Sequence, residues 1–98
     1  MALFFARESN TIVGSATVAL YPIPTGFRCM IEDVVVDEMY RGKGIGELLI
    51  LKCIDYAKSN KVFQIDLTSR PSRVSANHLY QKLGFKQRET NVYRLVLK

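Results

Sequence analysis

With 98 residues, 48% of them hydrophobic, the chain is long enough for one domain with its own core. No apolar run approaches the length of a membrane-spanning helix, and residues 1–6 are too short and lack the basic region of a signal peptide, so we expect a cytoplasmic protein. The net charge of +5 suits an anionic partner such as nucleic acid, a membrane surface or a phosphorylated small molecule, while the scattered basic residues exclude a polybasic tail.

The first half of the chain predicts three strands. Residues 2–7 are short and apolar, and turn residues separate them from a partner strand at 11–21. Gly14 inside the second strand indicates a bulge or a close backbone approach. Residues 22–26 hold two prolines and predict a loop, after which 28–37 form the third strand.

A glycine-rich stretch follows the third strand and leads into a helix. Apolar residues at three-and-four spacing predict a helix between Gly44 and Asn60, and Asn60 can take the left-handed conformation that ends it. Glycines remove side chains where backbone N–H groups must point outward, and the first helical turn adds unpaired donors and a positive dipole end. The stretch therefore predicts a site for an anion.

The second half predicts further strands around a second helix. Residues 62–68 form a strand that lies parallel to 28–37 through a right-handed crossover. The second helix opens at Pro71 and Ser72 and ends at Gly84. Final strands at 85–88 and 92–97 give the order β-β-β-α-β-α-β-β, which is a single domain 1–98 of α/β class with a mixed sheet (mixed α+β).

The two cysteines do not form a metal motif. Cys29 falls in a predicted strand and Cys53 in a predicted helix, without the spacing of a metal site, and His78 is the one histidine. We expect buried reduced thiols and no zinc or other metal. His78 points away from the apolar stripe of its helix and is expected at the surface.

Two motifs narrow the identity of the anion. A P-loop needs a Gly-Lys-Ser/Thr ending that the chain lacks, and a dinucleotide fingerprint needs a glycine at position 47, where Glu47 stands. The residues Arg41, Gly44 and Gly46 instead match the Q/R-x-x-G-x-G/A signature of the GCN5-related N-acetyltransferase (GNAT) family, and residues 77–85 resemble its N-x-x-Y-x-x-x-G-F segment. The resemblance covers about the whole chain from the first hairpin onward.

The resemblance implies acetyl-CoA as co-substrate and assigns residues to it. The pyrophosphate would be held by backbone N–H groups of the loop, with the cationic side chains of Arg41 and Lys43 nearby. The loop residues are Arg41, Gly42, Lys43, Gly44, Ile45 and Gly46. The strand residues Val34, Val35 and Val36 would offer backbone groups to the pantetheine arm, and Asn77 would contact the cofactor. Tyr80 would be the general acid that protonates the CoA thiolate. From periodicity alone, the valines are a buried strand and Tyr80 is a core residue on an apolar stripe.

Glu32 is the candidate to accept the proton that the substrate amine loses. Strand alternation puts Glu32 on one face with Val34 and Val36 unless a bulge intervenes, and it puts Asp33 on the other. Glu32 can take the proton through water, hold a cationic substrate, or be a salt-bridged surface residue. Arg70 and Arg73 can likewise meet a substrate anion or be solvated charges.

The chain departs from the family at its start. Family members usually have a strand and two helices before the first hairpin, and those helices form part of the acceptor wall. The absence of this strand and these helices before the hairpin leaves three interpretations: an open site for a bulky acceptor, a partner subunit that completes the site, or a fragment of a longer protein. Because an exposed sheet edge favours pairing with another chain, we expect a homodimer.

These observations predict an enzyme that transfers acetyl from acetyl-CoA to a primary amine, of a small molecule or a peptide, by direct attack. Residues 31–36 also resemble the glucosamine-phosphate acetyltransferase branch, a likeness that does not name a substrate. One alternative is a non-catalytic acyl-CoA-binding or regulatory domain. Another is a basic nucleic-acid-binding module, which the scattered charges and the lack of a base-stacking motif disfavour, so we expect no nucleic-acid or membrane partner.

Overall fold

The computed structural model describes residues 1–97 of the chain. Backbone contacts divide it into two compact units, Met1–Thr68 and Ser69–Lys98, and each unit is described by itself. The first unit holds the sheet and the first helix, and the second holds the other helix. The mixed α+β class is confirmed, whereas the organisation as one domain stays a prediction.

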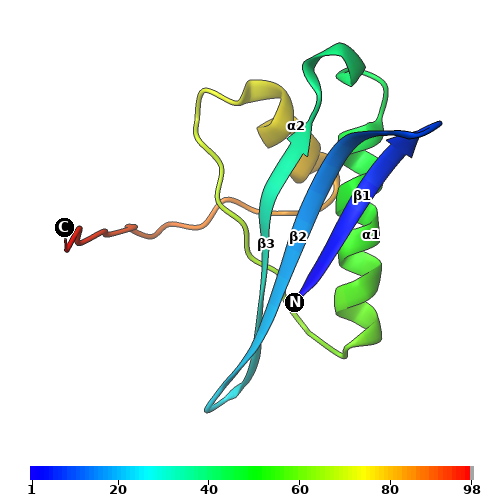
Figure 1. Ribbon diagram of the computed structural model, residues 1–98. Helices are drawn as coiled ribbons and strands as arrows, with labels where there is room; N and C mark the ends of the chain where they lie inside the picture. Colours follow the sequence, from blue (N-terminus) through cyan, green and yellow to red (C-terminus); the bar gives the residue numbers. More distant parts are fainter. Residues whose placement is uncertain (98) are drawn as a thin grey trace. The chain divides into compact units, whose positions relative to one another are not determined.

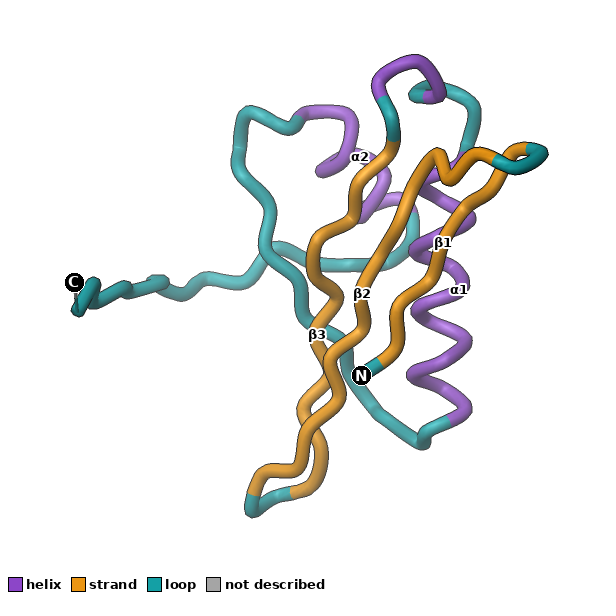
Figure 2. The backbone as a smooth tube through the Cα atoms, in the orientation of Figure 1, coloured by secondary structure: helices purple, strands orange, loops and turns teal. Residues whose placement is uncertain are grey.

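Three antiparallel strands form the sheet of the first unit, in the order β1-β2-β3 (Figure 1). Their bounds are Ala2–Glu8 for β1, Thr11–Ile23 for β2 and Gly26–Val36 for β3. The predicted loop at 22–26 is shorter in the structure, a turn at residues 24–25, because Pro22 pairs with Phe27 and Ile23 with Gly26 (Figure 2 shows the hairpin). β1 reaches only to the level of Val18, so at Pro22 strand β2 has a neighbour on one side, which is where proline is tolerated.

Gly14 marks a close approach, as its position in the strand predicts. A Cβ built on Gly14 would stand 3.0 Å from the carbonyl oxygen of Val35 and 3.1 Å from Cδ1 of Leu49. A side chain at this position would press on the backbone of β3, which yields less easily than a flexible side chain, and on the side chains of the first helix, so glycine favours the close packing of helix and sheet.

Helix α1, Ile45–Ser59, covers one face of the sheet (Figure 1). The core lies between the two layers and contains, among its buried side chains, Val18, Ile31, Ile50, Cys53 and Ala57. At its end, Asn60 does not take the predicted left-handed conformation, with φ of −95°. Its side-chain amide instead donates to the carbonyl of Tyr56 at 2.8 Å, and Lys61 takes the left-handed position with φ of 60°.

The predicted strand at 62–68 is reduced to one parallel bridge. Asp66 accepts a hydrogen bond from the N–H of Ile31 and donates one to the carbonyl of Cys29, both at 3.0 Å. The parallel direction is therefore confirmed, but the strand is not formed. A bulge at Asp33, described below, bends β3 just beyond the bridge, and this bend limits the ladder.

The second unit contains helix α2, Val74–Lys82. It begins after the turn at Pro71 and Ser72 rather than within it, and Gly84 follows with φ of 101°, as expected of a terminator. Residues 85–88 and 92–97 form no strand in the described chain, so the predicted order reduces to β-β-β-α-α. A strand needs a hydrogen-bonded neighbour, and the second unit supplies none among its described residues.

Candidate functional site

The loop between β3 and α1 is anchored to the sheet at its start. The N–H of Asp37 donates to the carbonyl of Val13 at 2.8 Å, which holds the end of β3 against β2. A short 3₁₀ turn, η1 (Glu38–Tyr40), follows, and the Asp37 carboxylate accepts from the N–H of Met39 at 3.4 Å. Asp37 thus caps the turn, as a carboxylate at such a position commonly does.

Two glycines set the path of the loop toward the helix. Gly42 has φ of 80° and Gly44 has φ of 82°, and no heavy atom lies within 4 Å of a Cβ built at either position. These positions therefore need glycine for the backbone conformation and not for lack of space. Left-handed residues of this kind occur in the backbone concavities that bind anions.

Helix α1 begins without a capping side chain. Gly44 is its N-cap, and the first intrahelical bond runs from the N–H of Leu48 to the carbonyl of Gly44, at 3.1 Å. The N–H groups of Ile45 and Gly46 precede that bond and have no acceptor inside the helix. Together with the positive end of the helix dipole, they form a site for negative charge.

Both predicted cations of the loop are held by neighbouring groups. Nε of Arg41 donates to the carbonyl of Val36 at 3.1 Å, so the guanidinium is tied back to the end of β3. Nζ of Lys43 lies 5.1 Å from the ring centroid of Tyr40, a cation–π contact. Sequence reasoning missed Tyr40, and its aromatic ring three residues before Lys43 was the available signal.

A bulge in β3 overturns the prediction that Glu32, Val34 and Val36 share a face. Glu32 pairs with Thr17 and Val35 with Ser15, so β3 has one more residue than β2 over this span. The extra residue shifts the alternation, and Glu32 falls on the face away from α1, together with Val35.

Val36, in the same span of β3, lies on the face of the sheet that α1 covers. Val36 pairs with Gly14, whose built Cβ would meet side chains of α1. Asp33, at the bulge, has φ of 53°, a left-handed conformation that aspartate tolerates better than most residues. Because a bulge leaves its extra residue outside the ladder, backbone groups near Val34 are released from pairing with β2.

Tyr80 lies on α2 in the second unit and is 6% exposed. Its ring packs edge to face on Phe85, with centroids 6.0 Å apart, and the N–H of Phe85 donates to the carbonyl of Tyr80 at 2.9 Å. Within residues 1–97 no group hydrogen-bonds the Tyr80 hydroxyl. The hydroxyl is thus available to a ligand, although the ring is held by packing.

Asn77 has a structural partner. Its side-chain Nδ2 donates to the carbonyl of Arg70 at 2.9 Å and holds the turn that precedes α2. A cofactor contact through its remaining oxygen stays a prediction. His78 is exposed, which confirms its place at the surface. The loop residues and Glu32 belong to the first unit, whereas Asn77 and Tyr80 belong to the second, and each set is described within its own unit.

The cysteines are buried and not disulfide-bonded, as predicted. Burial, and next the proximity of Cys29, raise the pKa of the Cys53 thiol to about 11. Burial also raises the pKa of Cys29, with a smaller contribution from Asp66. Both thiols are therefore protonated at neutral pH and are not nucleophiles.

Residues 1–97 contain neither a cluster of metal-binding side chains nor a membrane-spanning helix. No group of three or more His, Cys, Asp or Glu residues there could hold a metal ion. No helix there combines the length and the apolar character needed to cross a membrane.

A glycine loop thus leads from the bulged strand β3 to the uncapped start of α1. The model of the acetyltransferase (GNAT) family matches residues 1–85, and the chain belongs to this family. The chain is 37% identical over 90 residues to a glucosamine 6-phosphate N-acetyltransferase of Trypanosoma brucei brucei, with 89% of this chain and 59% of that protein covered.

Two further proteins are similar. An N-alpha-acetyltransferase, RimI, of Mycobacterium tuberculosis is 30% identical over 82 residues, with 84% of this chain and 50% of that protein covered. A solved acetyltransferase structure from Trypanosoma brucei superposes with a TM-score of 0.78 at 35% identity, with 97% of this chain and 66% of that chain covered. The chain thus spans about half the length of these two curated relatives, 59% of one and 50% of the other.

Proposed function

We propose that the protein is an acetyl-CoA-dependent N-acetyltransferase that acts on a primary amine. The observation that carries the proposal is the loop at residues 41–46, where two left-handed glycines precede a helix start with no capping side chain. Membership of the acetyltransferase family supports the same reaction class. Free cysteines are usual in a reducing compartment, so we propose a cytoplasmic enzyme.

The pyrophosphate of CoA would sit at the start of α1. Its negative charge would meet the N–H groups of Ile45 and Gly46 and the peptide groups of the glycine turns. Arg41 would add charge while its bond to the carbonyl of Val36 keeps the loop joined to the strand. The strand carbonyls and N–H groups at Val34–Val36 would hold the pantetheine arm beside the bulge.

The reaction would proceed by direct attack. The neutral amine nitrogen forms a bond to the thioester carbon, and collapse of the tetrahedral intermediate breaks the carbon–sulfur bond and releases the CoA thiolate. Tyr80 would give its hydroxyl proton to that thiolate. The proton lost from the amine passes to water or to a base, and the tyrosine is reprotonated from solvent.

Glu32 is the candidate for the amine side of this reaction. Its carboxylate is exposed on the face of the sheet away from α1. It would take the amine proton through water or hold a cationic substrate. The two roles differ in which kinetic parameter Glu32→Gln changes: loss of a base lowers kcat and alters the acid limb of its pH profile, whereas loss of a group that only holds the substrate raises KM.

A turnover assay tests the proposal. Purified protein is mixed with acetyl-CoA and an amine, and released thiol is measured. Glucosamine 6-phosphate is the first amine to try, because it is the substrate in the name of the relative from Trypanosoma brucei brucei. Other amino sugars, amino acids, polyamines and basic peptides follow. Amine-dependent thiol release is the expected result, and CoA binding without release for any amine would instead favour a non-catalytic acyl-CoA-binding domain.

A further inference from the structure

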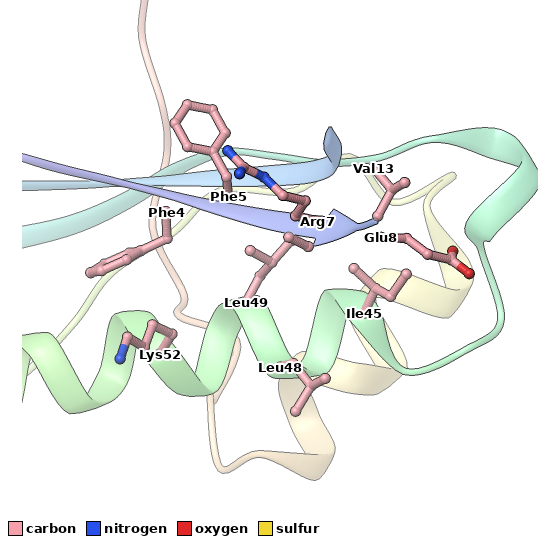
Figure 3. Close-up of a pocket in the computed structure, with 10 residues that line it drawn as sticks. Phe4, Phe5, Arg7, Glu8, Val13, Ile45, Leu48, Leu49 and Lys52 are labelled. Carbon is pink, nitrogen blue, oxygen red and sulfur yellow. The ribbon is translucent and has the colours of Figure 1, made fainter. Parts of the chain in front are cut away.

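The start of α1 takes its positive side-chain charge from the loop before it. Figure 3 shows Ile45 and Leu49 directed from the helix toward strand β1, so the first turns of α1 present apolar side chains to the sheet. Lys52, the first basic residue of the helix, lies about two turns beyond its start. Within residues 41–52, Arg41 and Lys43 are therefore the side chains that can bring positive charge to the glycine loop.

The two loop cations are held in different ways. Nε of Arg41 donates to a carbonyl at the end of β3, which ties the guanidinium to the sheet. Lys43 lies between Gly42 and Gly44, and no heavy atom lies within 4 Å of a Cβ built at either glycine. Within residues 1–97, the ring of Tyr40 is the one group that contacts the Lys43 ammonium. The position of the Lys43 charge thus depends on Tyr40.

Tyr40 is itself fixed by the turn that carries it. It is the last residue of η1, its N–H donates to the carbonyl of Asp37 at 2.8 Å, and its side chain is half-buried. The N–H of Asp37 in turn donates to the carbonyl of Val13 in β2. The ring is therefore attached to the sheet through a short chain of backbone hydrogen bonds, and Nζ of Lys43 lies 5.1 Å from its centroid.

We propose that Tyr40 is a positioning residue, whose ring holds the Lys43 ammonium where it meets a phosphate of CoA. A lysine side chain loses rotamer freedom when it binds a ligand, and a ring that holds the ammonium beforehand reduces this loss. The ring covers one side of the ammonium and leaves its other N–H donors for phosphate oxygens. This inference rests on the proposed function, because it takes CoA as the ligand of the loop.

The absence of a competing carboxylate supports the same role. No carboxylate of residues 1–97 forms an ion pair with Lys43, so its charge is not neutralised by the protein. An aromatic ring holds a cation without cancelling that charge, whereas a carboxylate would cancel it and compete with the phosphate. Tyr40 thus restrains Lys43 and keeps it attractive to an anion.

Titration calorimetry with CoA at low ionic strength tests the proposal. Lys43→Met removes the charge and should weaken CoA binding about fivefold, and Tyr40→Leu removes the ring and should weaken it about threefold. Tyr40→Phe keeps the ring and should bind CoA within about 1.5-fold of the parent. Lys58→Met is the matched control, because Lys58 is exposed in the last turn of α1, and its CoA affinity should equal that of the parent.

The double variant separates positioning from a merely structural role. If Tyr40 acts through Lys43, Tyr40→Leu should weaken CoA binding no further once Lys43→Met is present, whereas independent effects would multiply to about fifteenfold. NMR provides a readout that needs no ligand. The ε-methylene protons of Lys43 should be shifted upfield by the ring in the parent and in Tyr40→Phe, and this shift should be lost in Tyr40→Leu.

Each contrary result would overturn the proposal. These results are independent losses in the double variant, tighter CoA binding by Tyr40→Leu, Tyr40→Phe as weak as Tyr40→Leu, or no ring shift at Lys43 in the parent. If the parent binds CoA, they leave the proposed function standing. A parent with the ring shift but no saturable CoA binding would overturn both the proposed function and this inference.

Discussion

Replacing Gly44 by alanine probes the loop that leads into α1. Gly44 has φ of 82°, and a Cβ there would meet no heavy atom within 4 Å. The penalty is therefore conformational, about 1–2 kcal/mol for an L residue in the left-handed region. In a domain of this size, that loss lowers the melting temperature by roughly 4–16 °C. Thermal unfolding followed by circular dichroism measures it.

The same substitution should weaken CoA binding. If the loop shifts to relieve the strain, at least one hydrogen bond from a backbone N–H to the pyrophosphate is lost, about 1.5–3 kcal/mol for a charged acceptor. The dissociation constant for CoA, measured by titration calorimetry, should then rise about tenfold to hundredfold.

Gly26→Ala is the matched control for this experiment. Gly26 also has a positive φ, 134°, with open space around it, but it lies in the turn between β2 and β3. This variant should lose stability and keep its CoA affinity. If Gly44→Ala is destabilised to a similar degree and still binds CoA as tightly as the parent, the loop is not the cofactor site.

Three further predictions concern single side chains. Tyr80→Phe should lower kcat by roughly 10²-fold and leave CoA affinity nearly intact, and a full-speed variant would remove Tyr80 from the mechanism. Arg41→Lys keeps the charge but loses the Nε bond to Val36, so CoA affinity should fall about threefold to tenfold by calorimetry, and unchanged affinity would show that charge suffices. The pKa of Cys53 is raised from 9.0 to about 11, so the stability it contributes is full below about pH 9 and is lost as pH rises through about 11. The free energy of unfolding, measured with urea, should fall more steeply between these pH values in the parent than in Cys53→Ala. Equal slopes would contradict the assignment of the raised pKa to Cys53.

The loop and both helices were predictable because their causes are local. Left-handed glycines, three-and-four apolar spacing and a terminal glycine act within a few residues of the backbone they shape, and α1 and Gly84 agree with them. The end of α1 shows the limit of this reasoning. Asn60 and Lys61 can both adopt positive φ, and the side-chain bond from Asn60 to Tyr56 decides that Lys61 does.

From the sequence, Glu32 shares a face with Val34 and Val36 unless a bulge intervenes, and the structure puts Glu32 and Val36 on opposite faces. Alternation is a rule for an uninterrupted strand, and the bulge at Asp33 interrupts it. Asp33 tolerates the left-handed conformation of the bulge, but an aspartate in a strand does not by itself specify a bulge. The bulge becomes visible only when Thr17 and Ser15 of β2 are set against β3.

The strands predicted in the second half failed for a related reason. Residues 92–97 are a short, mostly apolar run of the kind that forms strands, yet they pair with nothing among the described residues and stay exposed. Residues 62–68 reach β3 only at Asp66. A helix closes its hydrogen bonds within its own segment, whereas a strand depends on a neighbour that its own sequence does not specify.

The sequence by itself therefore determined the glycine loop, the helix it opens and the family, since glycine conformation, helix capping and motif spacing are properties of adjacent residues. Only the tertiary structure decided the side of the sheet that carries Glu32 and the reduction of residues 62–68 to one parallel bridge. Both depend on which segments meet across the sheet. Contacts between distant segments follow from the packing of the whole unit, and no local pattern encodes them.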